Sequence, residues 1–176
     1  LAGVMLLTGA FSVGAATDPA LIDAVKQGDA GAVRALLAKK ADVNAPAVDT
    51  STALDWAVDA NSLEMVNLLI DAGANVNAET RYKITPMSLA CKNGNTAIIE
   101  RLLKAGVDAN STSEEGQTAL MTAALNGRVD AIKMLLSHGA KVNAVEPYKG
   151  QTALMWAAGE GNADAAALLI EFGGDV

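Results

Sequence analysis

The feature that most constrains this chain is a phrase of seven residues that recurs at a nearly fixed spacing. Its clearest copies begin with Thr, place Leu or Met two residues later, and place Ala three residues after that. The first residues of the five copies stand at positions 19, 52, 85, 118 and 152, which gives spacings of 33, 33, 33 and 34. A period of this length is typical of stacked-repeat proteins, in which each unit packs between its neighbours.

Each repeat contains two short apolar patterns separated by a residue that tolerates a left-handed backbone. The separators are glycine in four repeats and asparagine in one: Gly28, Asn61, Gly94, Gly127 and Gly161. After the separator, apolar residues fall at i, i+3 and i+4, which is one stripe of an amphipathic helix. We therefore predict two helices per repeat and an all-α solenoid of about five helix–turn–helix units with projecting hairpins.

A second turn follows the second helix of each repeat, as in the sequence A-G-A-N-V-N-A of residues 72–78. The glycine of this turn fits a helix C-terminal position with positive φ. In the first repeat Lys40 takes its place, so we expect that helix to end less favourably.

We place the repeats at about 17–46, 47–79, 80–112, 113–146 and 147–176. The 34-residue step should lengthen or reshape the hairpin that carries Tyr148.

Residues 1–17 carry no charge and end in small side chains. As a helix they would extend about 24 Å, which is less than the roughly 30 Å of a hydrocarbon core. The small residues Gly14, Ala15 and Ala16 are typical of a signal-peptidase site. We therefore predict that residues 1–16 are the remainder of a secretory signal, truncated at its N-terminus, and that residues 17–176 form the repeat domain. The alternative is an apolar cap that lies on the first repeat.

Charge and composition argue against several function classes. With 20 acidic and 13 basic residues the net charge is −7, and no run of Lys or Arg occurs, so we expect no nucleic-acid partner. The single cysteine, Cys91, occupies a small core position in its repeat, and the single histidine, His138, precedes a turn. A nucleophile needs an activating base, and metals need grouped ligands. We expect no enzyme activity, no cofactor, no metal site, and no membrane insertion after signal removal.

The repeats resemble ankyrin repeats, whose phrase is G-x-T-P-L-H-x-A-A, followed by a helix that ends L-L-x-x-G-A-x-V-N. The resemblance covers residues 19–176, and residues 150–158, G-Q-T-A-L-M-W-A-A, are its clearest copy. Proline follows the opening residue only at Pro86, and the histidine of the phrase is absent from every repeat, so the Thr–His hydrogen bonds that the phrase implies are unavailable. The histidine positions hold Ile22, Asp55, Ser88, Met121 and Met155. The phrase T-A-L-M-W-A-A is similar to bacterial versions of the family, which implies a bacterial, periplasmic or extracellular protein.

The resemblance implies a non-catalytic scaffold that binds a protein partner through a concave surface made of hairpin tips and first helices. We expect this surface to be mostly acidic and the chain to be a monomer. The resemblance does not identify the partner. The alternative is a structural spacer or regulatory region of a longer multidomain exported protein.

Candidate partner-binding residues are those at positions where the repeats differ. Two positions follow the alanines of each first helix, and the hairpin tips vary and carry both tyrosines of the chain. Tyrosine favours interfaces because it combines apolar area with a polar end. The candidates are Asp59, Tyr82, Lys92, Asn93, Leu125, Asn126, Tyr148 and Glu160. The alternative for these residues is a solvated surface without a partner.

Trp56 and Trp156 occupy equivalent positions in their repeats. We expect both to pack between helices, and the alternative is that they are aromatic anchors for a partner.

Overall fold

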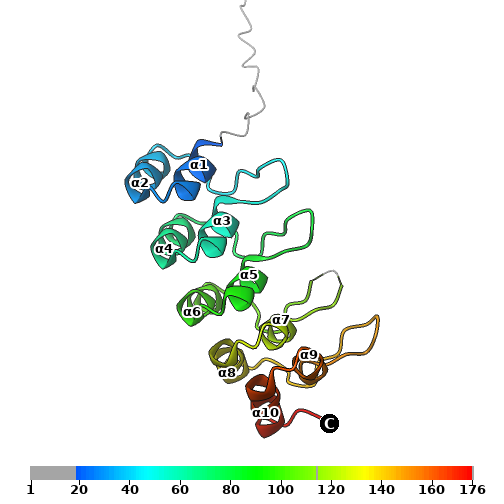
Figure 1. Ribbon diagram of the computed structural model, residues 1–176. Helices are drawn as coiled ribbons and strands as arrows, with labels where there is room; N and C mark the ends of the chain where they lie inside the picture. The colour runs from blue at the N-terminus through cyan, green and yellow to red at the C-terminus, as the bar shows by residue number, and fades with distance from the viewer. Residues whose placement is uncertain (1–18, 114, 176) are drawn as a thin grey trace, which may run out of the picture.

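The computed structural model describes residues 19–113 and 115–175, which form five pairs of short α-helices stacked in one row (Figure 1). The first helices of the pairs are α1 Ala20–Lys26, α3 Ala53–Asp59, α5 Pro86–Asn93, α7 Ala119–Leu125 and α9 Ala153–Gly159. The second helices are α2 Ala30–Ala38, α4 Leu63–Asp71, α6 Thr96–Lys104, α8 Val129–Ser137 and α10 Ala163–Glu171. The predicted all-α solenoid is therefore confirmed, whereas the predicted signal, residues 1–16, lies outside the described residues.

Each helix packs on its partner in the same repeat and on the corresponding helices of adjacent repeats. In Figure 1 the second helices form one side of the row, and the hairpin loops project from the other side. Four of the first-helix alanines, Ala57, Ala90, Ala123 and Ala157, have no exposed surface, which allows neighbouring first helices to approach closely. No helix among the described residues is long and apolar enough to cross a membrane.

The predicted left-handed turns are present, including those that lack glycine. Asn61 separates α3 from α4 with φ of 59°, and Lys40 ends α2 with φ of 61°. The Ala41 N–H still donates to the Leu36 carbonyl at 3.1 Å, as the Ala74 N–H does to Leu69 at 2.9 Å. The first repeat therefore closes the same turn as the others, at a backbone cost for a left-handed lysine of roughly 1–2 kcal/mol.

Three of the five first helices, α3, α5 and α7, keep reciprocal N-terminal caps although the histidine of the family phrase is absent. The Thr52 N–H donates to Asp55 Oδ2 at 2.7 Å, and the Asp55 N–H donates to Thr52 Oγ1 at 3.4 Å. In the next repeat the Thr85 N–H donates to Ser88 Oγ at 3.0 Å. Asp55 and Ser88 thus provide hydrogen bonds to the opening Thr in place of the absent histidine. The sequence alone did not predict these bonds.

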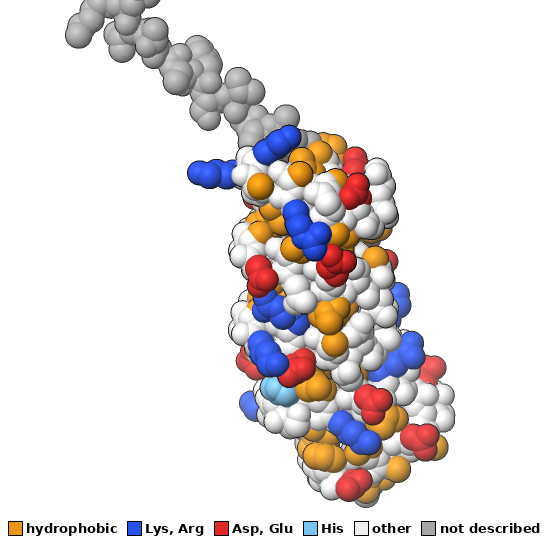
Figure 2. Space-filling model, turned by 90° about the vertical axis from the view of Figure 1, so that its left-hand side faces the viewer, with side chains coloured by type: hydrophobic (Ala, Val, Ile, Leu, Met, Phe, Trp, Pro, Cys, Tyr) orange, Lys and Arg blue, Asp and Glu red, His pale blue; other side chains and the backbone are white. Residues whose placement is uncertain are grey.

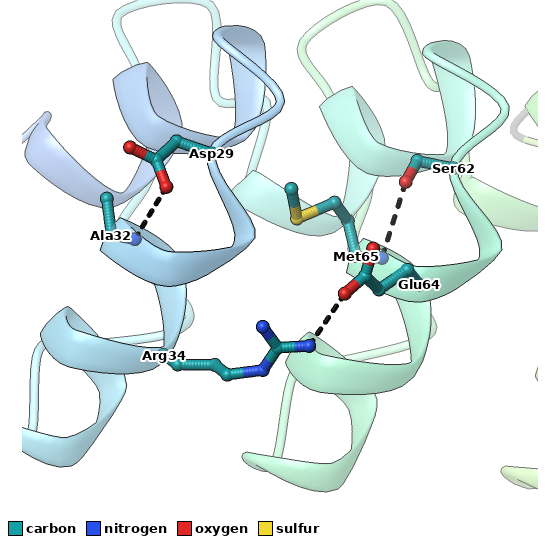
Figure 3. Close-up of polar contacts among 6 residues, drawn as sticks. All are labelled: Asp29, Ala32, Arg34, Ser62, Glu64 and Met65. Atoms are coloured by element: carbon teal, nitrogen blue, oxygen red, sulfur yellow. Dashed lines mark hydrogen bonds and ion pairs between the residues drawn. The ribbon is translucent and has the colours of Figure 1, made fainter.

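Side chains on the outer face join consecutive repeats. Arg34 of α2 and Glu64 of α4 form an ion pair of 2.6 Å, beside the caps that Asp29 and Ser62 provide for these two helices (Figure 3). Arg101 of α6 reaches back to Asp71 of α4 at 2.6 Å. Figure 2 shows acidic and basic side chains interspersed along this face, with apolar side chains between them. This mixture matches a solvated outer surface rather than a single-sign patch.

Candidate functional site

The side of the molecule that carries the hairpins has two adjoining grooves. The central groove has a volume of about 450 Å³ and lies between the hairpins of repeats 3 and 4, with Met87, Leu89 and Val107 among its lining residues. The C-terminal groove has a volume of about 550 Å³ and lies between α7 and α9, beside the hairpin of repeat 5. Leu125 lines both grooves, so they form one continuous surface across repeats 3 to 5.

Two pairs of neighbouring hairpins beside this surface are fixed to one another, those of repeats 2 and 3 and those of repeats 4 and 5. The Arg81 guanidinium donates to the Val48 carbonyl at 2.6 Å, and the Arg81 N–H donates to the Asp49 carbonyl at 3.2 Å. Between the hairpins of repeats 4 and 5, Gly116 has φ of 75° and lies so close to the ring of Pro147 that a Cβ at position 116 would overlap it. The hairpin tips therefore present a surface with a defined shape.

The hairpin of repeat 5 is one residue longer than the others, as the 34-residue step predicted. The Glu146 N–H donates to the Gln151 carbonyl, five residues away, whereas the Thr80 N–H donates to Ile84, four residues away. The Glu146 carboxylate organises the longer loop because it accepts N–H groups from Tyr148, Lys149 and Gln151 at 2.7, 2.8 and 3.1 Å. Burial would raise the pKa of this carboxyl, but the three N–H donors outweigh burial and lower its pKa below the usual 4.5.

Glu146 was not among the sequence-derived candidates. Its position before Pro147, at the start of a turn-forming run that ends in Gly150, was the available signal. An acidic side chain at the start of a loop commonly accepts backbone N–H groups of the residues that follow. Glu146 thereby fixes the loop on which Tyr148 is presented.

Six of the eight candidate residues line the grooves. Tyr82, Lys92 and Asn126 line the central groove, together with Leu125. Leu125, Tyr148 and Glu160 line the C-terminal groove. The tyrosines are 70% and 74% exposed, so most of their area is available to a partner.

The other two candidates, Asp59 and Asn93, line neither groove. The Asn93 Nδ2 group donates to the carbonyls of Val58 and Asp59 at 3.1 and 3.4 Å, which joins repeats 2 and 3. Asn126 also has a structural contact, because its Nδ2 group donates to the Thr122 carbonyl at 2.8 Å within α7. These bonds give both asparagines a role in the scaffold itself.

The two tryptophans occupy the same helix position but differ in their surroundings. Both are half-buried, consistent with the expected packing position. Trp56 Nε1 donates to Ser51 Oγ at 2.9 Å, and the Lys26 Nζ atom lies 3.9 Å from the centroid of the Trp56 ring. Trp156 lines the C-terminal groove, and its buried Nε1 has no hydrogen-bond partner among residues 19–113 and 115–175.

The expectation of a mostly acidic surface is wrong for the central groove. Glu79 and Lys83 form an ion pair of 3.5 Å at its edge, and Lys92 and Glu115 also line it. The C-terminal groove is closer to the expectation, because Glu115, Glu146 and Glu160 line it together with Lys149. Net charge alone did not predict this difference, since most acidic residues lie elsewhere on the molecule.

The remaining reactive side chains have structural positions. Cys91 is fully buried, and burial raises the pKa of its thiol to about 12. The Nδ1 atom of His138, which follows α8, lies 2.9 Å from the Met134 carbonyl. Within the described parts of the chain, no group of three or more His, Cys, Asp or Glu residues is placed to hold a metal ion.

Comparison with known proteins identifies the family to which these repeats belong. A family model described as ankyrin repeats, in three copies, matches residues 5–80 and 87–176. A search of curated proteins gave no match. Ankyrin repeats generally mediate protein–protein interaction, and the family is generally non-catalytic. With nearly the whole chain matched and helix pairs stacked in register, the chain belongs to the ankyrin repeat family.

Proposed function

We propose that the chain is an exported bacterial module that binds one protein partner along the two grooves and the adjoining hairpin tips. The observation that carries the proposal is the continuous grooved surface across repeats 3 to 5, flanked by the exposed side chains of Tyr82 and Tyr148. Half-buried Leu89 and Leu125 supply apolar area within it. A partner segment would bury this area, while polar groups at the rim would set its orientation.

The scaffold supports binding by rigid presentation. The Arg81 contacts join the hairpins of repeats 2 and 3, and the close approach of Gly116 to Pro147 joins those of repeats 4 and 5, so little ordering is needed when a partner binds. A preorganised surface loses less conformational entropy on association, which favours affinity. Export is proposed from the apolar, small-residue character of residues 1–16.

The experiment is partner capture by the immobilised chain from bacterial extracts. We expect a variant with alanine at Tyr82, Lys92, Asn126 and Tyr148 to lose at least about tenfold in capture, because truncating a tyrosine that is a binding hot spot costs about 2 kcal/mol or more. Periplasmic and cytoplasmic extracts are tested separately. Capture from the periplasmic extract is expected, and capture from the cytoplasmic extract alone would contradict export.

A matched control carries four alanines on or beside the second helices α8 and α10. All four replaced side chains are exposed, and none lines either groove: Lys133, Asp164, Glu171 and Phe172. The control variant should capture the partner as the original chain does. Equal capture by the groove variant and the original chain would overturn the proposal, once thermal melting shows that both are folded.

One observation favours the alternative role, a spacer or regulatory region of a longer exported protein. Repeat 5 exposes apolar side chains at positions that are covered in the preceding repeats. Met155 is 51% exposed whereas the equivalent Met121 is fully buried, and Ile170 is 50% exposed whereas Leu136 is half-buried. Such a face fits coverage by another folded unit. This role predicts that the groove variant behaves as the control does in the capture experiment.

A further inference from the structure

Two tryptophans occupy the same position in different repeats, and a cation of the chain lies over the ring of only one of them among the described residues. Trp56 and Trp156 are each the fourth residue of a first helix, α3 and α9. The first helix of the preceding repeat ends at Lys26 in the case of Trp56 and at Leu125 in the case of Trp156. Lys26 places its ammonium 3.9 Å from the Trp56 ring centroid, which is the geometry of a cation–π interaction.

Leu125 cannot supply a cation in the second case. Its side chain ends two atoms before the position of a lysine ammonium, and both Leu125 and Trp156 line the C-terminal groove. The position of Lys26 beside Trp56 is therefore held, beside Trp156, by a shorter and uncharged side chain that lines the groove. The Trp156 ring also lacks the hydrogen bond that fixes Trp56, because Gln151 stands at the position where the Ser51 hydroxyl oxygen accepts the Trp56 Nε1–H.

The charges around this place favour a cation. Glu115 lies on the hairpin of repeat 4, and Glu160 directly follows α9, so two different elements each contribute an exposed carboxylate to the groove lining. Lys149 is the only cationic side chain among the described residues that line it, against three glutamates. The Glu146 carboxylate is already engaged by three backbone N–H groups. A groove with this balance attracts positive charge and disfavours acidic segments.

We propose that the C-terminal groove binds its partner through a lysine or arginine side chain that lies over the Trp156 ring between Glu115 and Glu160. The occupant is an extended basic segment of a partner protein, and the exposed Tyr148 ring contacts the same segment from the hairpin. The inference rests on the proposed protein-binding function and specifies the chemistry of the partner. The guest cation takes over the kind of contact that Lys26 of repeat 1 makes within the chain to Trp56 of repeat 2.

The test uses the intrinsic fluorescence of Trp156. The chain has two tryptophans, so the Trp56→Phe background leaves Trp156 as the only reporter. The probe is an acetylated and amidated peptide, Gly-Ser-Arg-Gly-Ser-Arg-Gly-Ser, titrated to about 5 mM, and its neutral counterpart carries citrulline in place of arginine. We expect a saturable emission change with the arginine peptide and about tenfold weaker binding of the citrulline peptide, since a cation–π contact contributes up to about that factor.

Variants separate the proposed contact from general electrostatics. Glu115→Gln with Glu160→Gln should weaken arginine-peptide binding at least threefold, whereas Asp130→Asn with Glu171→Gln, the same charge change on the second helices, should leave it unchanged. Leu125→Lys should abolish binding by placing an internal ammonium over Trp156, as Lys26 does over Trp56. Leu125→Met, which is neutral, should retain binding.

Three results would overturn the inference: equal affinity for the two peptides, no response to either, or unchanged binding by the Leu125→Lys variant. The protein-capture experiment distinguishes this failure from failure of the proposed function. If the four-alanine groove variant still loses its partner, only the basic chemistry of the partner is wrong. If that variant also retains its partner, both proposals fail.

Discussion

At the scale of single residues, Asp55 shows how a substitution at a family position is accommodated. One carboxylate oxygen, Oδ2, accepts the Thr52 N–H at 2.7 Å and the Thr52 hydroxyl at 2.9 Å. The other, Oδ1, is buried without a hydrogen-bond partner in the described part of the chain. Burial raises the pKa of Asp55 above its usual 3.8, and the bonds from Thr52 only partly oppose this. The charged form of Asp55 is therefore tolerated less well in the folded protein than in the unfolded one.

This imbalance predicts a pH dependence with a defined sign. Because the folded state holds the Asp55 proton more tightly, the contribution of Asp55 to stability is greatest below about pH 4 and falls as pH rises through the raised pKa. Ser88 shows that serine caps this position without a charge, since its hydroxyl oxygen accepts the Thr85 N–H at 3.0 Å. We expect Asp55→Ser to gain stability relative to the original chain as pH rises from about 3.5 to 7.

Urea denaturation of both proteins across this pH range measures the difference. Ser88→Ala is the control, because it removes a cap of the same kind but no titratable group, and its stability difference should not change with pH in this range. A constant difference between the original chain and Asp55→Ser would show that Asp55 does not titrate abnormally. A difference that moves in the opposite direction would show that its pKa is lowered.

At the scale of structural elements, asparagines in the turns join each repeat to the next. Asn110 Nδ2 donates to the Gly139 carbonyl at 2.9 Å, and its Oδ1 accepts the Lys141 N–H at 2.8 Å. Asn44 and Asn143 make the same pair of bonds to the turns that follow them. One side chain thus satisfies both a donor and an acceptor at the end of a neighbouring helix.

The asparagines also provide a matched pair for mutation. Asn77 is at the equivalent turn position, but its hydrogen bond is within its own turn, where its backbone N–H donates to Asn75 Oδ1 at 3.0 Å. We expect Asn110→Ala to reduce the free energy of unfolding by about 1–2 kcal/mol, because two inter-repeat hydrogen bonds are lost. Asn77→Ala should cost less than about 0.5 kcal/mol. Equal losses in urea denaturation would show that the turn conformation, and not the inter-repeat bonds, is what asparagine stabilises.

The helices and turns of each repeat could be predicted from the sequence, but the contacts between repeats could not. The 33-residue period and the positions of Gly28, Asn61 and Gly94 predicted the helices and turns, because these depend on local backbone preference and apolar spacing. The bonds of Asn93 and Asn110 were not predicted, because they join residues about 30 positions apart and depend on the offset between stacked repeats. The sequence predicted residues that line the grooves, because these positions vary between repeats. It did not predict the shape of the grooves, which forms only when adjacent hairpins stack.

The difference between the two tryptophans illustrates the same limit. Their equivalence was visible in the sequence, but the Lys26–Trp56 contact joins the end of one helix to the middle of the next. No local pattern predicts which side chain lies over which ring. Once the stacking is known, the replacement of Lys26 by Leu125 at the corresponding place becomes informative about the partner.

At the scale of the whole molecule, the main contacts of each helix are with its partner helix and with helices of the adjacent repeats, so cooperativity depends on each interface in turn. Within the described residues, repeat 5 packs on repeat 4 alone, whereas repeats 2 to 4 each pack on two neighbours. Repeat 5 also exposes Met155 and Ile170, which reduces the apolar area that holds it in place. Repeat 5 should therefore unfold before the central repeats when its own core is weakened.

Three natural probes lie along the stack and can test this order of unfolding. Trp56 reports on repeat 2, Trp156 on repeat 5, and Cys91, the single cysteine, on repeat 3. Burial raises the pKa of Cys91 to about 12, so its alkylation requires both exposure and deprotonation, and the folded repeat should protect it. Single-tryptophan variants separate the two fluorescence signals.

Leu169→Ala and Leu69→Ala make the same change at equivalent, fully buried positions in repeats 5 and 2. Each substitution should destabilise its own repeat by about 2–5 kcal/mol. Because each repeat contacts only its neighbours, Leu169→Ala should shift the Trp156 transition to lower urea while the Trp56 transition and the protection of Cys91 from iodoacetamide stay nearly unchanged. Leu69→Ala should shift mainly the Trp56 transition. If either substitution instead moved all three signals together, the five repeats would unfold as one cooperative unit, and the exposed end of repeat 5 would have no separate effect on stability.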